Sequence, residues 1–574
     1  MYLTFTTKGN NQYASAATSH RNGKDTSISY KYIGRVVDLP RNIFYRRGTG
    51  YFIYDVNTDV IEPVPDTFVV PVHEDRRKKV CTAFDFGDSF LLNAIMSKSG
   101  FWDVVDVIPW KNKSTLHAMV IFYMTSRLAN CYADMWYNSN FIHLLCPGAY
   151  LESSGISDFL EKIGSPEALK AYHEAYVKFV FKHYHKDQNV LIDSMGLPNK
   201  SRMYLTRLNV HNGKVSLEAR LIVVAQKSTG IPLYFKLIPG NVNDAITLRP
   251  IKEHCSALGI DIDNCLLDAG YSTDINLDEF YNDKHECVTP YITRPKALAK
   301  YYKEKLVEIL PTLESREHFV QYKDRYVFIR HTKVYVGKKG DQPAYLYIGL
   351  DTSRLSDELH KLIKRAKRDD LTIDRVYEGM QNQGVFALLS GTEIADVDIL
   401  PEYYLRQGIE QLNDIAKNYT KLLPERSHKV ETFEGHVLLS MIGTAIIRFI
   451  QIQLNETEQY LGSRMEALRI QKVICYETKA VPDPPVKLAN DVYKAFSIEI
   501  PSFISIKKGA LEYTPPAQVT HLFKVPKPKA PKKNKLDKAP EKETDKGIQT
   551  ETAPNENQTS GDTDADKGKQ KKNG

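Results

Sequence analysis

The chain has 574 residues, of which 42% are hydrophobic and 26% are charged, and its net charge is +7. This composition predicts several folded cores and excludes a wholly disordered, collagen-like or coiled-coil protein. The longest apolar stretch, residues 437–447, is shorter than the roughly 20 residues of a membrane span, so we expect no membrane partner. Seven scattered cysteines without a CxxC pair indicate reduced thiols rather than a disulfide frame or a zinc site.

The first 186 residues divide into two regions. Residues 1–75 contain short β-prone runs at 27–33, 50–54 and 67–72, broken by Gly, Asn and Pro, which predict a small β-rich module. Residues 76–186 change to helical spacing, most clearly at 114–132 and 166–184. We therefore expect a β-rich N-terminal module followed by a helical region.

Residues 187–297 alternate between strand and helix patterns, which predicts an α/β core. The expected strands cover residues 190–192, 216–226, 231–239, 265–267 and 287–293, and the expected helices cover 245–258 and 274–281. Two of the apolar runs end on an acid, Asp193 and Asp268. At the carboxyl edge of such a sheet, the side chains that follow the strands project into one crevice.

Residues 298–396 interrupt this pattern with four strand candidates, at 325–330, 333–336, 344–350 and 385–389, and one basic helix at 356–367. The core resumes at 397–455 with a helix at 402–417 and a very apolar helix at 432–454. A C-terminal region follows at 456–524. Residues 525–574 contain 12 Lys, 9 Asp plus Glu and no aromatic residue, which predicts a disordered Lys-rich tail.

The helix expected at 402–417 carries four functional side chains on one face. At about 100° per residue, Tyr403, Arg406, Glu410 and Lys417 fall within about 60° of one another. A carboxylate among Arg, Lys and Tyr suits a site that holds a divalent metal and a phosphodiester together. Such a face is also typical of the solvated side of a helix, and a single acid at a strand end is commonly a cap, so spacing alone leaves both interpretations open.

Together, Asp193, Asp268 and Glu410 have the chemistry of a metal site. Hard ions such as Mg²⁺, or Mn²⁺ in its place, prefer oxygen ligands and keep open positions for water and phosphate oxygens. Two such ions about 4 Å apart activate an attacking water or 3′-hydroxyl and stabilise the leaving oxygen. Metal-dependent phosphoryl transfer is therefore one interpretation of the pattern, beside that of strand-end caps and a solvated helix face.

The spacing Tyr403-x2-Arg406-x3-Glu410-x6-Lys417 resembles the YREK signature of bacterial DDE transposases, those of insertion-sequence family four and its relatives. Other segments resemble that family in the same order along the chain. They are Leu191-Ile192-Asp193-Ser194, Gly230-Ile231-Pro232, Pro239-Gly240-Asn241 with Asp244 and Leu248, Leu267-Asp268-Ala269-Gly270-Tyr271, Pro424-Glu425-Arg426 and Gly435-His436.

The resemblance implies an RNase-H-like core, residues 187–297 and 397–455, split by the β-rich insertion at 298–396. It assigns catalysis and the ligation of two Mg²⁺ or Mn²⁺ ions to Asp193, Asp268 and Glu410. It places Tyr403, Arg406 and Lys417 on DNA phosphates. Arg294 and Lys296, which follow the strand ending near Thr293, would line the DNA channel or remain solvated loop charges.

The function implied is that of a DNA transposase, which binds the terminal inverted repeats of its element, cleaves the strands and transfers them to target DNA. A homodimer on double-stranded DNA is the expected working form, in the bacterial cytoplasm and associated with the nucleoid. The N-terminal part, 1–186, would include the module that recognises the repeats. Two alternatives stay open: a structure-selective nuclease of the same fold, and a transposase-derived DNA-binding protein without catalysis.

Overall fold

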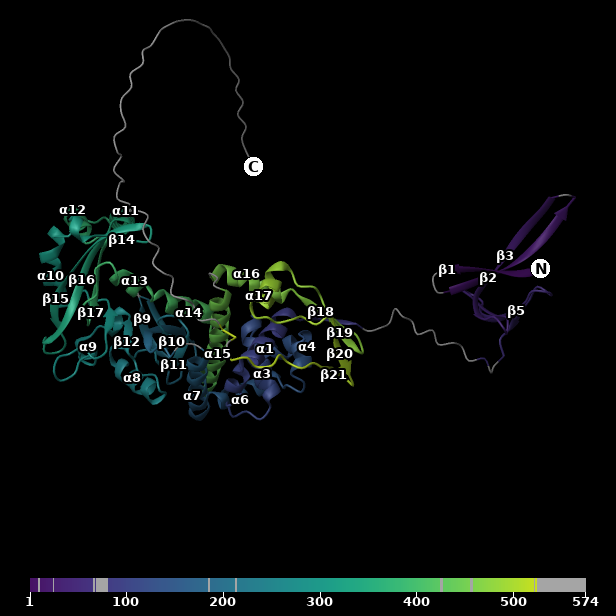
Figure 1. The fold of residues 1–574 in the computed structure, drawn as a ribbon, viewed down its shortest axis with the longest axis horizontal. Helices are drawn as coiled ribbons and strands as arrows, with labels where there is room; N and C mark the ends of the chain where they lie inside the picture. The colour runs from purple at the N-terminus through teal and green to yellow at the C-terminus, as the bar shows by residue number, and fades with distance from the viewer. Residues whose placement is uncertain are drawn as a thin grey trace, which may run out of the picture. The chain divides into compact units, whose positions relative to one another are not determined.

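The computed structural model describes residues 1–8, 11–23, 25–65, 68, 81–183, 186–211, 214–423, 427–454, 458–520 and 522–523. The expected tail at 525–574, most of the expected strand at 67–72 and the motif Pro424-Glu425-Arg426 lie outside these residues. Within them the fold is mixed α/β with three sheets (Figure 1). All seven cysteines are free thiols, as the sequence predicts.

The N-terminal residues form a six-stranded antiparallel sheet whose strands pair in chain order. Its own small core includes Ala14, Ile33, Phe44, Phe52 and Tyr54. The two predicted strands at 27–33 and 50–54 lie within this sheet. The strands are β1 (Tyr2–Lys8), β2 (Asn11–Asn22), β3 (Asp25–Asp38), β4 (Ile43–Arg46), β5 (Gly50–Asp55) and β6 (Val60–Pro63).

Residues 81–183 are predominantly helical, as their apolar spacing predicts. After the short strand β7 (Thr82–Asp85), the chain forms seven helices in the described residues. They are α1 (Gly87–Ser99), α2 (Phe101–Val105), α3 (Lys113–Thr125), α4 (Ala133–Ser139), α5 (Ile142–Leu145), α6 (Ser153–Ile163) and α7 (Pro166–His183).

The apolar helix α15 (Val430–Leu454) connects these helices to the rest of the core. It packs against α3 and α6 and also against α14 (Gln407–Asn418) (Figure 1). Among the described residues it alone is long and apolar enough to cross a membrane, and 83% of that stretch is buried inside the fold. Its hydrophobicity therefore serves the packing of helices against one another.

A ten-stranded sheet holds the residues of the predicted α/β core. Five neighbouring strands run in the order β11-β10-β8-β12-β13. The pairs β11–β10 and β10–β8 are antiparallel, whereas β8, β12 and β13 are parallel. The elements of this part are β8 (Asn189–Pro198), β9 (Arg207–His211), β10 (Lys214–Gln226), β11 (Pro232–Pro239), α8 (Leu248–Ala257), β12 (Asn264–Leu267), α9 (Asp274–Asp278) and β13 (Tyr291–Thr293).

The strands predicted between residues 298 and 396 extend this same sheet. β17 pairs with β13, and the order continues β17-β16-β15-β14 with antiparallel neighbours. The two strands expected at 325–330 and 333–336 are one continuous strand. The elements are α10 (Lys300–Ile309), β14 (Phe319–Tyr322), β15 (Arg325–Val336), β16 (Gln342–Asp351), α11 (Thr352–Asp369), α12 (Ile373–Met380) and β17 (Val385–Ser390).

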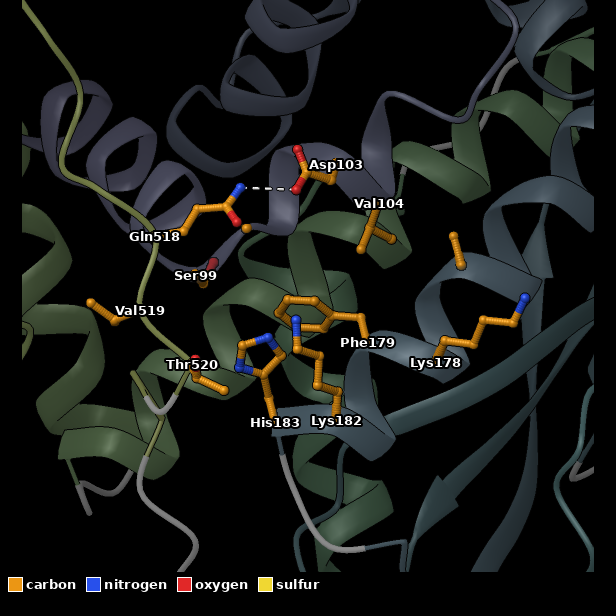
Figure 2. Close-up of a pocket in the computed structure, with 12 residues that line it drawn as sticks. Ser99, Asp103, Val104, Lys178, Phe179, Lys182, His183, Gln518, Val519 and Thr520 are labelled. Carbon is orange, nitrogen blue, oxygen red and sulfur yellow. Dashed lines mark hydrogen bonds between the residues drawn. The ribbon is translucent and has the colours of Figure 1, made fainter.

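The C-terminal region folds back onto the first helices. Strand β18 pairs with β7, with Lys472 opposite Asp85, in a sheet ordered β21-β20-β19-β18-β7. Further on, Val519 donates its backbone N–H to the Lys98 carbonyl, and Gln518 donates to Asp103 beside a cavity of about 430 Å³ (Figure 2). The elements are α16 (Glu458–Arg469), β18 (Lys472–Cys475), β19 (Lys479–Pro482), α17 (Lys487–Ala495), β20 (Ile504–Lys507) and β21 (Ala510–Glu512).

Candidate active site

Two adjacent parallel strands place Asp193 and Asp268 beside each other. In the register of β8 and β12, Ile192 lies opposite Leu267, and each acid is the next residue. The expectation that Asp193 ends its strand is wrong, because β8 continues to Pro198 through pairing with β10 on its other side. Only β12 ends at this level, so Asp268 leaves the sheet where Asp193 is still held within it.

The single regular helix expected at 402–417 is also wrong. The chain forms α13 (Ile399–Tyr404) and then α14, with a break at Leu405 and Arg406. At the break the backbone bonds tighten to i→i+3: Arg406 N–H donates to the Tyr403 carbonyl and Ile409 N–H to the Arg406 carbonyl. Beyond it, Gly408 lies against Gly230, where a β-carbon would be 3.5 Å from the Gly230 Cα.

The Arg406 side chain contacts all three acids of the predicted site. Its Nη2 lies 3.5 Å from Oδ2 of Asp193 and 3.2 Å from Oδ1 of Asp268, and its Nη1 lies 3.5 Å from Oε1 of Glu410. Only 17% of the arginine side chain is exposed, against 56% for Glu410. A strand, a strand end and a helix thus bring three carboxylates around one guanidinium.

Burial gives Asp193 an unusual protonation equilibrium. Loss of water raises the pKa of its carboxyl to about 6, and the charge of Asp268 adds to this, while the Arg406 charge opposes it. The Ser194 N–H donates to Oδ1 of Asp193 at 2.9 Å. A cation beside this carboxylate therefore stabilises its ionised form.

A buried polar network that the sequence did not predict supports Asp193. Arg220 Nη2 donates to Ser194 Oγ at 2.6 Å and to Asp244 Oδ2 at 2.9 Å, and Ser194 Oγ donates to Asp244 Oδ1 at 2.8 Å. Gly270 is required beside it, because a β-carbon there would lie 2.8 Å from Asp244 Oδ2. Ser194 and Asp244 stand in the segments that carry the resemblance, and the further signal in the sequence was a lone arginine within the apolar run of β10.

Substituting Asp244→Asn is expected to destabilise the fold by about 2 kcal/mol, because the buried Arg220 loses its charged acceptor. The Arg220 and Asp244 side chains are only 12% and 10% exposed. Urea unfolding followed by circular dichroism measures the change. Glu253→Gln, in the exposed Arg249–Glu253 pair, is the control and should change stability by less than about 0.5 kcal/mol. Equal effects of the two substitutions would contradict the role of the network.

The other predicted site residues form no ion pair with the three acids among the described residues. Tyr403 is buried with the Arg294 guanidinium 5.4 Å from its ring centroid, while Arg294 and Lys296 are exposed. The Tyr403 hydroxyl is buried without a hydrogen-bond partner. Lys417 lies about two turns beyond Glu410 on α14 and lines a cavity of about 670 Å³ with Lys421, Lys429 and other residues.

As the side chains stand, no group of three or more His, Cys, Asp or Glu among the described residues is arranged to hold a metal ion. In the candidate site each acid instead contacts the guanidinium of Arg406. A positively charged group therefore occupies the position between the three carboxylates. Any other cation that binds these three acids must therefore compete with the Arg406 guanidinium.

Comparisons with known proteins give little beyond this geometry. No family model matches the chain, and no curated protein matches it. Seven chains of solved structures are similar, among them one from the cryo-EM structure of the piggyBac transposase synaptic complex with hairpin DNA. That similarity has a TM-score of 0.35 and 9% sequence identity, and it covers 72% of this chain and 86% of the other.

Proposed function

We propose that this chain is a DNA transposase that cleaves DNA at the ends of its element and joins the freed 3′-hydroxyl to target DNA. The observation that carries the proposal is the convergence of Asp193, Asp268 and Glu410 on the Arg406 guanidinium. These four residues are among the six that the resemblance to YREK-signature transposases selects, the other two being Tyr403 and Lys417. The mixed order β11-β10-β8-β12-β13, with two acids on its adjacent central strands, supports an RNase-H-like core.

The chemistry of the donor set suits a divalent cation, because hard ions prefer carboxylate oxygens, although as the side chains stand no such group among the described residues is arranged to hold one. Three carboxylates, one of them buried, surround a position now taken by a guanidinium, which is a stand-in cation. Asp193, Asp268 and Glu410 would hold Mg²⁺ or Mn²⁺, two ions per site. Bound there, the metal supplies polarisation of the phosphodiester and a lowered pKa of the attacking water or hydroxyl.

The cationic side chains around the acids would bind and orient the DNA. Arg406 and Arg294 offer planar donors that match phosphate oxygens in pairs. Lys296 and Lys417 would extend the contact along the backbone, and such fixed donors stabilise the charge that develops on the phosphate. Because both ends of an element must be held together, a homodimer on DNA is the proposed working form.

The test uses the full chain, Mg²⁺ and a duplex carrying the terminal repeat that flanks its own gene, analysed on a denaturing gel. We expect wild-type protein to cut at the repeat boundary and Glu410→Gln to lose cleavage while it retains DNA. Asp414→Asn, an exposed acid on the same helix, is the matched control and should cleave normally.

Other outcomes identify other functions. Cleavage of branched duplexes without strand-transfer products would indicate a structure-selective nuclease. DNA retention without cleavage, in Mg²⁺ and in Mn²⁺, would indicate a DNA-binding protein without catalysis. Absence of DNA binding would overturn the proposal.

DNA affinity is expected to fall steeply with salt, with log K dropping by about 0.9 per neutralised phosphate for each log unit of salt. Fluorescence anisotropy at several salt concentrations measures this slope. Lys296→Gln should reduce the slope by about 0.9, because one phosphate contact is lost. Lys300→Gln, whose side chain is 88% exposed on α10, is the control. A flat salt response would argue against phosphate contacts.

A further inference from the structure

Arg406 is held as the counter-ion of the acid cluster. It contacts an acid on β8, another just after β12 and a third on α14, and 83% of its side chain is out of water. The broken helix delivers it there, because the tight turn at Leu405 and Arg406 separates it from the regular face of α14. One positive charge thus faces three carboxylates in a partly dry site.

A guanidinium and a divalent cation compete for these oxygens. The Arg406 contacts reach Oδ2 of Asp193, Oδ1 of Asp268 and Oε1 of Glu410. If a metal ion binds the same carboxylates, the arginine must first be released. The free energy of that release weakens metal binding. A DNA phosphate offers the released guanidinium an alternative pair of oxygen acceptors.

We propose that Arg406 and the divalent metal exchange in this site, and that a bound phosphate favours the exchange by accepting the arginine. The inference rests on the proposed function, since it takes the acid cluster as the metal site. Metal and DNA then bind with positive coupling, and by linkage each raises the affinity of the other. In this way the chain acquires its metal chiefly when a phosphodiester is in place.

Two measurements without DNA test the exchange in the full chain. Electron paramagnetic resonance titration with Mn²⁺ is expected to show about tenfold tighter binding by Arg406→Gln than by wild type, because the competing cation is gone. Arg294→Gln removes a neighbouring cation, the one stacked on Tyr403, and should change Mn²⁺ affinity by less than about threefold. Arg406→Lys, a point charge that cannot contact three acids at once, should fall between.

The second measurement follows Arg406 itself in the wild-type protein. Modification by phenylglyoxal, located by mass spectrometry, is expected to increase several-fold at Arg406 on adding Mg²⁺, while Arg294 stays equally reactive. This result does not depend on the folding of any variant. A phosphate-bearing duplex added with Mn²⁺ should tighten Mn²⁺ binding to wild type more than to Arg406→Gln.

The two measurements distinguish failure of the proposed exchange from failure of the proposed metal site. Mn²⁺ binding to wild type with Arg406 still protected from phenylglyoxal overturns the exchange and leaves the metal site standing. Equal Mn²⁺ affinity of wild type and Arg406→Gln does the same. Failure of both proteins to bind Mn²⁺ overturns the metal site and the exchange together.

Discussion

Replacing Asp193 by asparagine is expected to reduce Mg²⁺-dependent DNA cleavage by about 1000-fold or more. Asparagine keeps the shape of the side chain but removes the charge that would hold a metal ion between β8 and β12. Single-turnover cleavage of an end-labelled duplex on a denaturing gel measures the rate. DNA affinity, measured by anisotropy without divalent metal, should stay within about threefold, because the cationic residues that would contact phosphate are unchanged.

Asp88→Asn is a matched control for this loss. Asp88 lies on α1, and burial raises the pKa of its carboxyl to about 6, as it does for Asp193. Both substitutions therefore remove a buried carboxyl, but only one lies in the candidate site. We expect Asp88→Asn to cleave DNA at the wild-type rate. Cleavage by Asp193→Asn at a tenth of the wild-type rate or faster would show that the acid cluster is structural.

Arg448→Ala is expected to lower the free energy of unfolding by about 4 kcal/mol, which urea titration would measure. Arg448 is buried on α15, and its Nε and Nη2 donate to the Thr229 carbonyl at 3.0 and 2.7 Å. Its Nη1 donates to Gln411 on α14 at 3.1 Å and also to Gln451. Truncation leaves the acceptors of Thr229 and Gln451 buried without this donor and opens a cavity.

The same arginine joins the turn after β10 to the helix that carries Glu410, so its loss should also loosen the candidate site. Arg249→Ala is the control, because its side chain is 71% exposed and pairs with Glu253 on its own helix and with Glu279 at 4.0 Å. We expect that control to change stability by less than about 0.5 kcal/mol. A loss below about 1 kcal/mol for Arg448→Ala would show that the turn and helix are held by packing alone.

Much of the local structure follows from the sequence. The apolar runs at 216–226, 231–239 and 265–267 form β10, β11 and β12, and the apolar segment at 432–454 forms α15. These predictions succeed because alternating or continuous apolar residues have one favourable way to be buried. The candidate site residues Asp193, Asp268, Arg406 and Glu410 are also named by their spacing and by resemblance, and the structure brings them together.

The pairing of strands that are distant in the sequence determined features that the local sequence pattern could not predict. Asp193 lies inside its strand because β10 pairs beyond it, and the strands after residue 319 extend the core sheet because β17 pairs with β13. β7 and β18, almost 400 residues apart in the chain, are neighbours for the same reason. Hydrogen bonds between strands distant in sequence leave no periodicity within either strand.

The sequence by itself determined which residues carry charge and which runs must be buried. The break at Arg406 appears only in the tertiary structure, where Gly408 lies against Gly230 and Arg448 joins α14 to the turn after β10. That break turns an arginine expected on a helix face into the shared partner of three acids. Contacts between residues far apart in the chain leave no local periodicity, and the electrostatics of the candidate site depend on such contacts.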